Sequence, residues 1–410
     1  NQTLADYLTS GFWADFSTTS VKWDLDDSGL YAKDGLITYN TIGNSFDTDG
    51  ISSKRAELVE EAFKYLEVIT GIDFESTNLD ADFNFGDEDS GAYAQTFSNG
   101  EFISYVNINI SSSWNSAASG FGNYTYQTIL HEIGHGLGLG HQGKYNGGSP
   151  SYDSADVLYS NDSWQISIMS YIDQEQNTSI NADYVFLSSF MVSDMIAIDD
   201  LYASEEIGIS KAFNGDTIYG FNTNIDGSNS AILNEMSTWI SSTTYTIVDG
   251  SGTDTLDFNG FSDHQKIDLR ASEKNSSSLF ASNIAGNIGN LVIAPGSIIE
   301  NAIGGSGDDE LTGNSSNNTL NGGIGQDTMI GGEGDDTLIG GEGSDTASYL
   351  TSGSAVSINL LFSTFSGGDA DGDTLTSIEN IVGSEFADLI IGDSQNNSLN
   401  GGSGNDTRIS

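Results

Sequence analysis

The chain of 410 residues has no cysteine, two prolines and only 11 lysine and arginine residues. The absence of cysteine excludes disulfides and thiolate metal ligands, so a metal that stabilises this fold must use other side chains. No apolar run is long enough to cross a bilayer, so we expect no membrane insertion. Residues 1–6 also do not show the basic and then apolar pattern of a secretory signal peptide.

Acidic residues are in large excess, 59 against 11 basic ones, which gives a formal net charge of −48. Such a chain repels the phosphates of nucleic acids and anionic lipid surfaces, so we expect neither as a partner. Much of the charge lies in glycine-rich repeats, which favours a divalent cation as partner over a disordered acidic tail. The length corresponds to two or three domains.

Histidine is also rare, and three of the four histidines stand close together as His131, His135 and His141. On a helix, His131 and His135 face the same side, with Glu132 beside the first. Three imidazole ligands suit zinc and leave one coordination position for water, from which Glu132 is placed to take a proton. An ordinary pair of core or surface histidines would not account for Glu132, Gly138 and His141 at these offsets.

The segment after the helix carries two further signals. His141 cannot stay on the helix face of His135, so we expect Gly138 to end the helix with a positive φ and return His141 to the metal. A second segment, Ser-Ile-Met-Ser-Tyr at 167–171, follows further along. Together these motifs resemble the metzincin clan of zinc proteases, and the form of the second segment resembles the serralysin family of secreted bacterial metalloproteases.

The resemblance implies roles for two residues of the second segment. Met169 would pack beneath the zinc histidines without binding the metal. Tyr171 would be an additional zinc ligand in the resting enzyme, and would hydrogen-bond the oxyanion once substrate arrives. Without the resemblance, Met169 would be an ordinary core methionine and Tyr171 a packing residue.

Residues 1–205 are expected to form an α+β zinc-metallopeptidase domain of metzincin type. Apolar spacing predicts helices at 52–69, 124–137 and 187–202, the first ending at Gly71, and strands at 72–74, 83–85 and 102–110. Residues 91–95 fall where serralysin-like enzymes carry an edge strand that bounds the cleft and could pair with an extended substrate. A simple loop or a structural strand is the alternative.

Residues 206–410 are expected to form an all-β domain, a parallel β-roll or sandwich, with nonapeptide repeats at 304–348 and 383–409. In the first block the sixth position reads Asp309, Asn318, Asp327, Asp336 and Asp345, and the eighth reads Leu311, Leu320, Met329, Leu338 and Ala347. This period is typical of the calcium-binding RTX repeat, in which glycine turns face a cation and the eighth residue packs inward. A flexible glycine linker would not keep this phase.

The family resemblance implies that each calcium ion lies between one turn and the turn two repeats later. One expected site uses Gly305, Gly307, Asp309, Gly322, Ile324 and Asp327, and the next uses Gly323, Gly325, Asp327, Gly340, Glu342 and Asp345. An intermediate site would use Asn314, Ser316, Asn318, Gly331, Glu333 and Asp336, and should bind more weakly because Asn318 is uncharged. Looser matches upstream are Phe213, Gly215, Thr217, Asp249, Ser251 and Asp254 for one site, and Gly252, Asp254, Ile298 and Glu300 for another.

The end of the chain departs from the pattern. Repeats begin at Gly383, Gly392 and Gly401, but the eighth position of the last one is Arg408. A roll is not expected to end with a charge at its inward position and without a cap, so we expect a truncated or processed product that lacks the export signal. The insertion at 349–375 has no assignment from the sequence.

We therefore expect a secreted zinc endopeptidase with one catalytic zinc ion and several structural calcium ions. Expected partners are polypeptide substrates and, as a further hypothesis, a proteinaceous protease inhibitor, with the chain a monomer. The resemblance implies export without a signal peptide. The alternative is a non-catalytic calcium-binding adhesin or matrix protein with a vestigial zinc site, against which the intact Glu132 and Met169 count. A lipase is not favoured, because 147–150 does not supply a nucleophile elbow.

Overall fold

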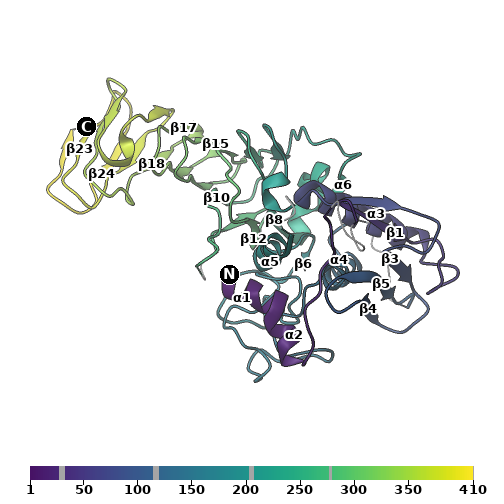
Figure 1. The fold of residues 1–410 in the computed structure, drawn as a ribbon. Coiled ribbons are helices and arrows are strands. Elements are labelled where there is room, and N and C mark those ends of the chain that lie inside the picture. Colours follow the sequence, from purple (N-terminus) through teal and green to yellow (C-terminus); the bar gives the residue numbers. More distant parts are fainter. Residues whose placement is uncertain (27–32, 114–119, 203–206, 277–278, 410) are drawn as a thin grey trace.

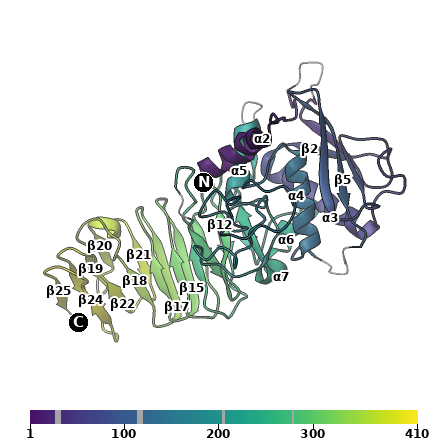
Figure 2. The ribbon, with the colours of Figure 1, turned by 90° about the horizontal axis from the view of Figure 1, so that it is seen from below.

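The computed structural model describes residues 1–26, 33–113, 120–202, 207–276 and 279–409. The molecule is elongated: helices and a mixed sheet form one end, and the C-terminal strands stack in succession toward the other (Figure 1, Figure 2). The expected boundary at 205/206 lies outside the described residues. In the part of the chain that is described, no helix is long and apolar enough to span a membrane.

The first part contains a five-stranded sheet in the order β2 (Asp73–Ser76), β1 (Leu36–Asn40), β3 (Phe83–Gly86), β5 (Ile103–Ile110) and β4 (Ala92–Ser98). The first four strands are parallel, and β4 is antiparallel to β5 at the edge of the sheet. The predicted edge strand at 91–95 is therefore confirmed as a strand, and its pairing with a substrate stays a prediction. The predicted strands at 72–74, 83–85 and 102–110 correspond to β2, β3 and β5.

The predicted helices are present, with one wrong boundary. Helix α3 (Ser53–Thr70) is capped at its C-terminus by Gly71, whose φ of 76° is left-handed. Helix α4 (Tyr124–Gly136) is capped at its N-terminus by Asn123, whose side chain accepts a hydrogen bond from the Tyr126 amide. Helix α5 (Val192–Tyr202) was expected to begin at Leu187. Leu187 belongs instead to β6 (Phe186–Leu187), because its amide donates to Gln127 and the strand pairs with β8 (Thr243–Ile247).

Short helices were missed because they offer no periodic pattern. The chain begins with α1 (Gln2–Asp6), a π-helical turn η1 (Tyr7–Gly11) and α2 (Phe12–Asp15). The second half contains α6 (Ala231–Asn234) and α7 (Met236–Trp239), so the expectation of an all-β domain was wrong at this point. The Ala231 amide donates to Glu61 of α3, and Ile232 and Leu233 are buried, so packing against the first half stabilises α6.

The C-terminal half is built on two long sheets. The larger runs β24 (Ser398–Asn400), β22 (Asn380–Val382), β18 (Thr346–Ser348), β16 (Thr328–Ile330), β14 (Glu310–Thr312), β10 (Lys266–Asp268), β11 (Ala281–Ile284), β12 (Asn287–Ile293), β8 and β6. The other runs β21 (Thr374–Thr376), β17 (Thr337–Gly343), β15 (Thr319–Gly325), β13 (Asn301–Ile303), β9 (Thr255–Asp257) and β7 (Ile218–Gly220). Because β6 belongs to the first half, one sheet joins both halves of the chain.

The nonapeptide strands are parallel, as predicted. Leu311 pairs with Met329 and Leu320 pairs with Leu338, so each strand lies beside the strand two repeats later. The eighth-position side chains from Leu311 to Ala347 are fully buried between the sheets. The last repeats differ: β25 (Thr407–Ile409) is the edge of a four-stranded sheet with β20 (Thr364–Ser366), β19 (Ser357–Asn359) and β23 (Leu389–Ile391), and Arg408 is exposed there.

Candidate metal centre and active site

The three histidines of the motif converge at the C-terminal end of α4. His131 and His135 lie on the helix, and Gly138, with a φ of 100°, lets the chain turn back so that His141 joins them. The ligand nitrogens of the three rings lie within 4.8 Å of one another, and Nε2 of His135 is 3.0 Å from Nε2 of His141. A β-carbon placed on Gly138 would lie 2.5 Å from the Val21 carbonyl oxygen, so this turn requires glycine.

Backbone carbonyls fix the tautomer of the two helix histidines. Nδ1 of His131 lies 2.8 Å from the Ile168 oxygen, and Nδ1 of His135 lies 2.8 Å from the Leu139 oxygen. A carbonyl can only accept, so each Nδ1 carries the proton and each Nε2 presents a lone pair toward the shared centre. This is the arrangement of metal-binding histidines.

Burial keeps the imidazoles neutral. It lowers the pKa of His131 to about 4, and burial together with the charge of His131 lowers the pKa of His135 to about 3. The pKa of His141 is lowered for the same reasons. Neutral imidazole is the form that binds a metal, so the three nitrogens fit Zn²⁺ at neutral pH.

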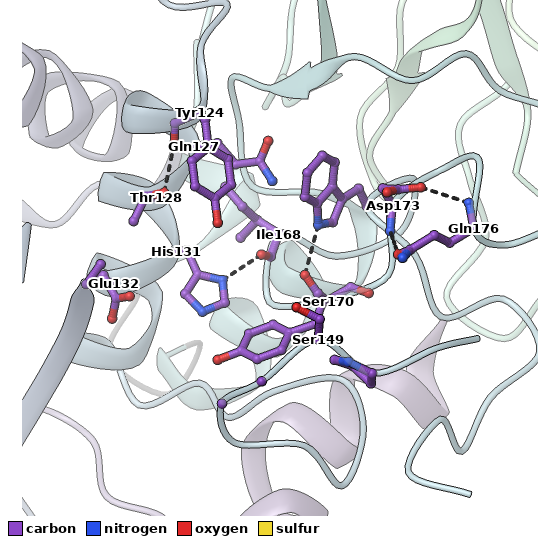
Figure 3. A pocket seen from close by; sticks show the side chains of 16 residues that line it. Tyr124, Gln127, Thr128, His131, Glu132, Ser149, Ile168, Ser170, Asp173 and Gln176 are labelled. Carbon is purple, nitrogen blue, oxygen red and sulfur yellow. Dashed lines mark hydrogen bonds between the residues drawn. The ribbon is translucent and has the colours of Figure 1, made fainter. Parts of the chain in front are cut away.

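Glu132 lies beside this centre in a cavity of about 480 Å³. The cavity is lined by Ala92, Tyr124, His131, Glu132, Trp164 and Tyr171, among others. Figure 3 shows His131 and Glu132 extending from α4 toward this space, with the Ile168 carbonyl beside His131. Burial raises the pKa of Glu132 to about 8, although a hydrogen bond from the backbone of Ala94 in β4 opposes the shift. A nearby divalent cation would favour the carboxylate.

Met169 lies against the helix that carries the histidines. Its side chain is fully buried, and a β-carbon placed on Gly134 would lie 2.6 Å from its sulfur. Glycine at position 134 therefore allows the segment around Met169 to pack directly on α4 between His131 and His135. The sequence motif contains Gly134, but its packing reason becomes visible only in the structure.

Tyr171 lies next to the histidines and stacks on a second tyrosine. Its ring is 4.5 Å from the ring of His141 and 4.9 Å from that of Tyr145, between centroids. The Tyr145 hydroxyl donates to buried Asp162 at 3.0 Å, and the Ser170 hydroxyl donates to the same carboxylate at 2.6 Å. Burial and the charge of Glu132 raise the pKa of Tyr171 to about 12, so its phenol keeps its proton at pH 7.

Sequence reasoning missed a buried carboxylate beneath the site. Asp194 in α5 accepts hydrogen bonds from the Ser167 hydroxyl at 2.6 Å and from the Ile168 amide at 2.7 Å. Asp194 is fully buried, and burial raises its pKa to about 7. The sequence signal for this carboxylate was an acidic residue among the apolar residues of α5. That signal did not show that Asp194 would bind the segment around Ile168.

The structure brings together the residues of the two main expected calcium sites. The Asp309 amide donates to Asp327 at 2.8 Å, and the Asp327 amide donates to Asp345 at 2.9 Å, so the turns stack as expected. One oxygen of each of five expected ligands is buried without a hydrogen-bond partner: Asp249, Asp254, Asp327, Asp336 and Asp345. Buried carboxylate oxygens need a partner, and Ca²⁺ fits this oxygen donor set.

The intermediate site differs because an amide group takes part. Nδ2 of Asn318 donates to the Glu300 carbonyl at 3.0 Å. In the second block of repeats, Nδ2 of Asn397 makes the corresponding bond to the Glu379 carbonyl at 3.1 Å. The Glu300 carbonyl also accepts from the Thr319 amide at 3.1 Å. Weaker binding at Asn318 stays a prediction.

The upstream residues also lie together. The Gly215 amide donates to the Ser251 carbonyl at 2.6 Å, and the Thr217 amide donates to Asp254 at 2.6 Å. The Asp254 amide in turn donates to Glu300 at 2.7 Å. The Phe213 carbonyl already accepts from Gly250 and Ser251. Gly252 packs against Gly215, and Ile298 is largely exposed. Their roles as ligands stay predictions.

Parallel repeat strands in the C-terminal half and a helix with converging histidines in the N-terminal half are the two features that the resemblance to zinc proteases of the serralysin type implies. Residues 210–409 match the family model described as Peptidase M10 serralysin C terminal. The chain is 42% identical over 196 residues to Metalloprotease AprA of Pseudomonas entomophila (strain L48), which covers 47% of this chain and 37% of that protein. It is 40% identical over 211 residues to Serralysin C of Dickeya chrysanthemi, and the match covers 51% of this chain and 40% of that protein.

A third relative, Serralysin of Photorhabdus luminescens, is 39% identical over 191 residues, covering 46% of this chain and 36% of that protein. Residues 210–409 therefore match the C-terminal part of the serralysin family, and the chain is similar to serralysins over about half of its length. It spans about two fifths of the length of these relatives.

Proposed function

We propose that the chain is a secreted zinc-dependent endopeptidase, with a catalytic unit of metzincin type in residues 1–205. The observation that carries the proposal is the convergence of three histidine nitrogens, one of which, that of His131, lines the same cavity as Glu132. His131, His135 and His141 would hold the ion. Bound Zn²⁺ would supply a Lewis acid that makes water more acidic and polarises a peptide carbonyl.

Glu132 is the proposed general base. Its carboxylate takes the proton of the attacking water and delivers it to the departing amine. The Ala94 backbone in β4 holds this carboxylate at the cavity wall. Tyr171, whose raised pKa keeps its phenol protonated, is the proposed donor to the oxyanion.

We infer that the edge strand β4 aligns the substrate. Ala92 of β4 lines the cavity, and β4 has a partner only on the side of β5 among the described strands. An extended polypeptide could add to its free edge by backbone hydrogen bonds and place a peptide bond beside Glu132. Polypeptide substrates are therefore the proposed partners.

Calcium is the proposed structural cofactor of residues 206–410, and the five unpartnered carboxylate oxygens support it. The same ions would link folding of the repeats to arrival outside the cell, where calcium is plentiful. Export itself is inferred from the family.

Hydrolysis of casein by the purified chain tests the proposal. We expect activity that a zinc-selective chelator abolishes, that added Zn²⁺ restores, and that excess calcium alone does not restore. Absence of proteolysis from a zinc-loaded and calcium-loaded chain would favour the alternative of a non-catalytic calcium-binding adhesin or matrix protein.

A further inference from the structure

Tyr171 is linked to a buried carboxylate to which the proposed mechanism gives no role. Asp162 is fully buried and is not among the residues that line the cavity of Glu132. Its oxygens accept from the Ser170 hydroxyl at 2.6 Å and from the Tyr145 hydroxyl at 3.0 Å. A buried carboxylate costs free energy unless hydrogen bonds replace the lost water, and two neutral hydroxyl groups do this here. These two donors connect Asp162 to the site.

The two donors approach Tyr171 in different ways. Ser170 precedes it in the chain, and the Ser170 oxygen also accepts from the Ile172 amide at 3.0 Å, so the backbone on both sides of Tyr171 is fixed. The ring of Tyr145 stacks on the ring of Tyr171, with 4.9 Å between centroids and 23° between planes. The Tyr145 hydroxyl also accepts from the Tyr171 amide at 3.4 Å. One carboxylate thus restrains both the backbone and the ring of Tyr171.

This restraint matters because of where the Tyr171 ring lies. The ring lines the cavity that contains Glu132, and its centroid is 4.5 Å from that of His141 and 5.8 Å from that of His131. A tyrosine side chain rotates about two torsions, and fixing both before substrate arrives avoids an entropy cost in the transition state. A hydroxyl group that must donate to an oxyanion benefits directly from such preorganisation.

We propose that Asp162 is a positioning residue for Tyr171: through the hydroxyl groups of Tyr145 and Ser170 it holds the phenol in the orientation that donates to the oxyanion. The inference rests on the proposed function, because the oxyanion forms only in peptide hydrolysis. An ionised carboxylate can only accept, so both hydroxyl groups direct their protons to it. The Tyr145 oxygen then keeps a lone pair for the Tyr171 amide.

The alternative is that Asp162 only anchors the loop on which it lies. Its backbone is already held, because the Asp162 amide donates to the Tyr159 carbonyl at 3.1 Å and the Asp162 carbonyl accepts from Asn177 at 3.0 Å. An anchoring side chain would affect stability whether or not Tyr171 has a hydroxyl group. A positioning side chain would affect turnover only while that hydroxyl group is present.

A double-mutant cycle on the full chain separates the two roles. Asp162→Asn presents an amide donor to one of the two hydroxyl groups, and Tyr145→Phe removes one link while it keeps the ring stack. Each is made in the unaltered chain and in Tyr171→Phe, and kcat, KM and zinc content are measured. Asp153→Asn, which removes an exposed carboxylate from the same loop, is the matched control.

We expect Asp162→Asn to lower kcat by about tenfold or more, with little change in KM or in zinc content. Tyr145→Phe should act in the same direction, and it carries the test if Asp162→Asn does not fold. In the Tyr171→Phe chain the same two substitutions should lower kcat by less than about twofold, because the hydroxyl group is already absent. Equal losses of kcat with and without the Tyr171 hydroxyl group, or an equal loss in Asp153→Asn, would overturn the proposal.

A fluorotyrosine incorporated at position 171 gives a second readout that needs neither zinc nor substrate. We expect one narrow ¹⁹F resonance in the otherwise unaltered chain and in Asp153→Asn, and a shifted or broadened resonance in Asp162→Asn and in Tyr145→Phe. Resonances that are the same in all four chains would contradict the positioning of Tyr171 by Asp162. If the unaltered chain showed no proteolysis, that result would count against the proposed function, and the resonances would still test the positioning.

Discussion

Asp194 holds the backbone that orients His131: its carboxylate accepts the Ile168 amide at 2.7 Å, and the Ile168 carbonyl lies 2.8 Å from Nδ1 of His131. A single peptide unit thus connects a buried carboxylate of α5 with a proposed zinc ligand of α4. The bond from the Ser167 hydroxyl, 2.6 Å long, fixes the same carboxylate from the other side.

Replacing Asp194 by asparagine should weaken zinc binding. The amide keeps the shape but turns one acceptor into a donor that faces donors, so the Ile168 peptide would shift and release His131. Loss of such an outer partner typically costs about 10- to 100-fold in metal affinity. Competition with a chromogenic zinc chelator measures it, with Asp200→Asn, exposed on the same helix, as control. Equal zinc affinities in the Asp194→Asn and Asp200→Asn variants would show that Asp194 does not support zinc binding.

Tyr171→Phe should lower kcat more than it raises KM. The proposed hydrogen bond to the oxyanion exists mainly in the transition state, so its loss affects turnover more than substrate binding. The ring stack with Tyr145 is kept by phenylalanine, which separates the hydroxyl from the packing. Steady-state kinetics on a peptide substrate measures both constants, and unchanged kinetics would leave Tyr171 as a packing residue only.

Without calcium, the repeats should be more stable at pH 5 than at pH 8. Burial and neighbouring carboxylates raise the pKa of Asp327 to about 6 and of Asp336 to about 7, above the ordinary value of 3.8. Between pH 3.8 and these raised pKa values, the folded repeats bind more protons than the unfolded chain. The stability that this protonation provides is therefore lost as the pH rises through 6 to 7. With calcium the order should reverse, because calcium binds the ionised carboxylates.

Hydrogen exchange of β15 to β18, with calcium chelated and then at saturating calcium, measures this. The buried histidines act in the opposite direction, since the pKa of His131 is lowered, and exchange resolved by segment keeps the two regions apart. Protection of these strands that is independent of pH in chelator would contradict the prediction.

Calcium should also raise the stability of the chain in proportion to the sites filled. The buried stripe from Leu311 to Leu338 is thin, and the acidic turns repel one another until cations bridge them. Each site that binds only the folded state should add roughly 2.7 kcal/mol at a hundredfold excess of calcium over its dissociation constant. A melting temperature that does not change across a calcium titration would show that the repeats fold for another reason.

Local periods predicted much of this molecule, and contacts between distant segments did not follow from them. The offsets from His131 to His141 indicated the metal centre, and the nine-residue period indicated the parallel strands, because each is set by neighbours along the chain. Asp162 and Asp194 meet their partners only through tertiary packing, so no spacing revealed them. The start of α5 was wrong because β8, far along the chain, pairs with Leu187.

The insertion shows the same limit. Its sequence breaks the nine-residue period, yet Asp373 regains the sixth position by a hydrogen bond to a turn 37 residues earlier. A search for the nine-residue period finds only an interruption in this segment. The turns stack nevertheless, because their position depends on the pairing of strands across the sheet.

The most direct test of the account is the Glu132→Gln variant, assayed together with its zinc content. Glutamine keeps the shape of the side chain and leaves the three histidines in place, but it cannot take a proton. We expect one zinc ion per chain, as in the unaltered protein, with proteolysis reduced by about 10²- to 10⁴-fold. Unaltered turnover in a zinc-loaded variant free of contaminating protease would contradict the assignment of Glu132 as the general base.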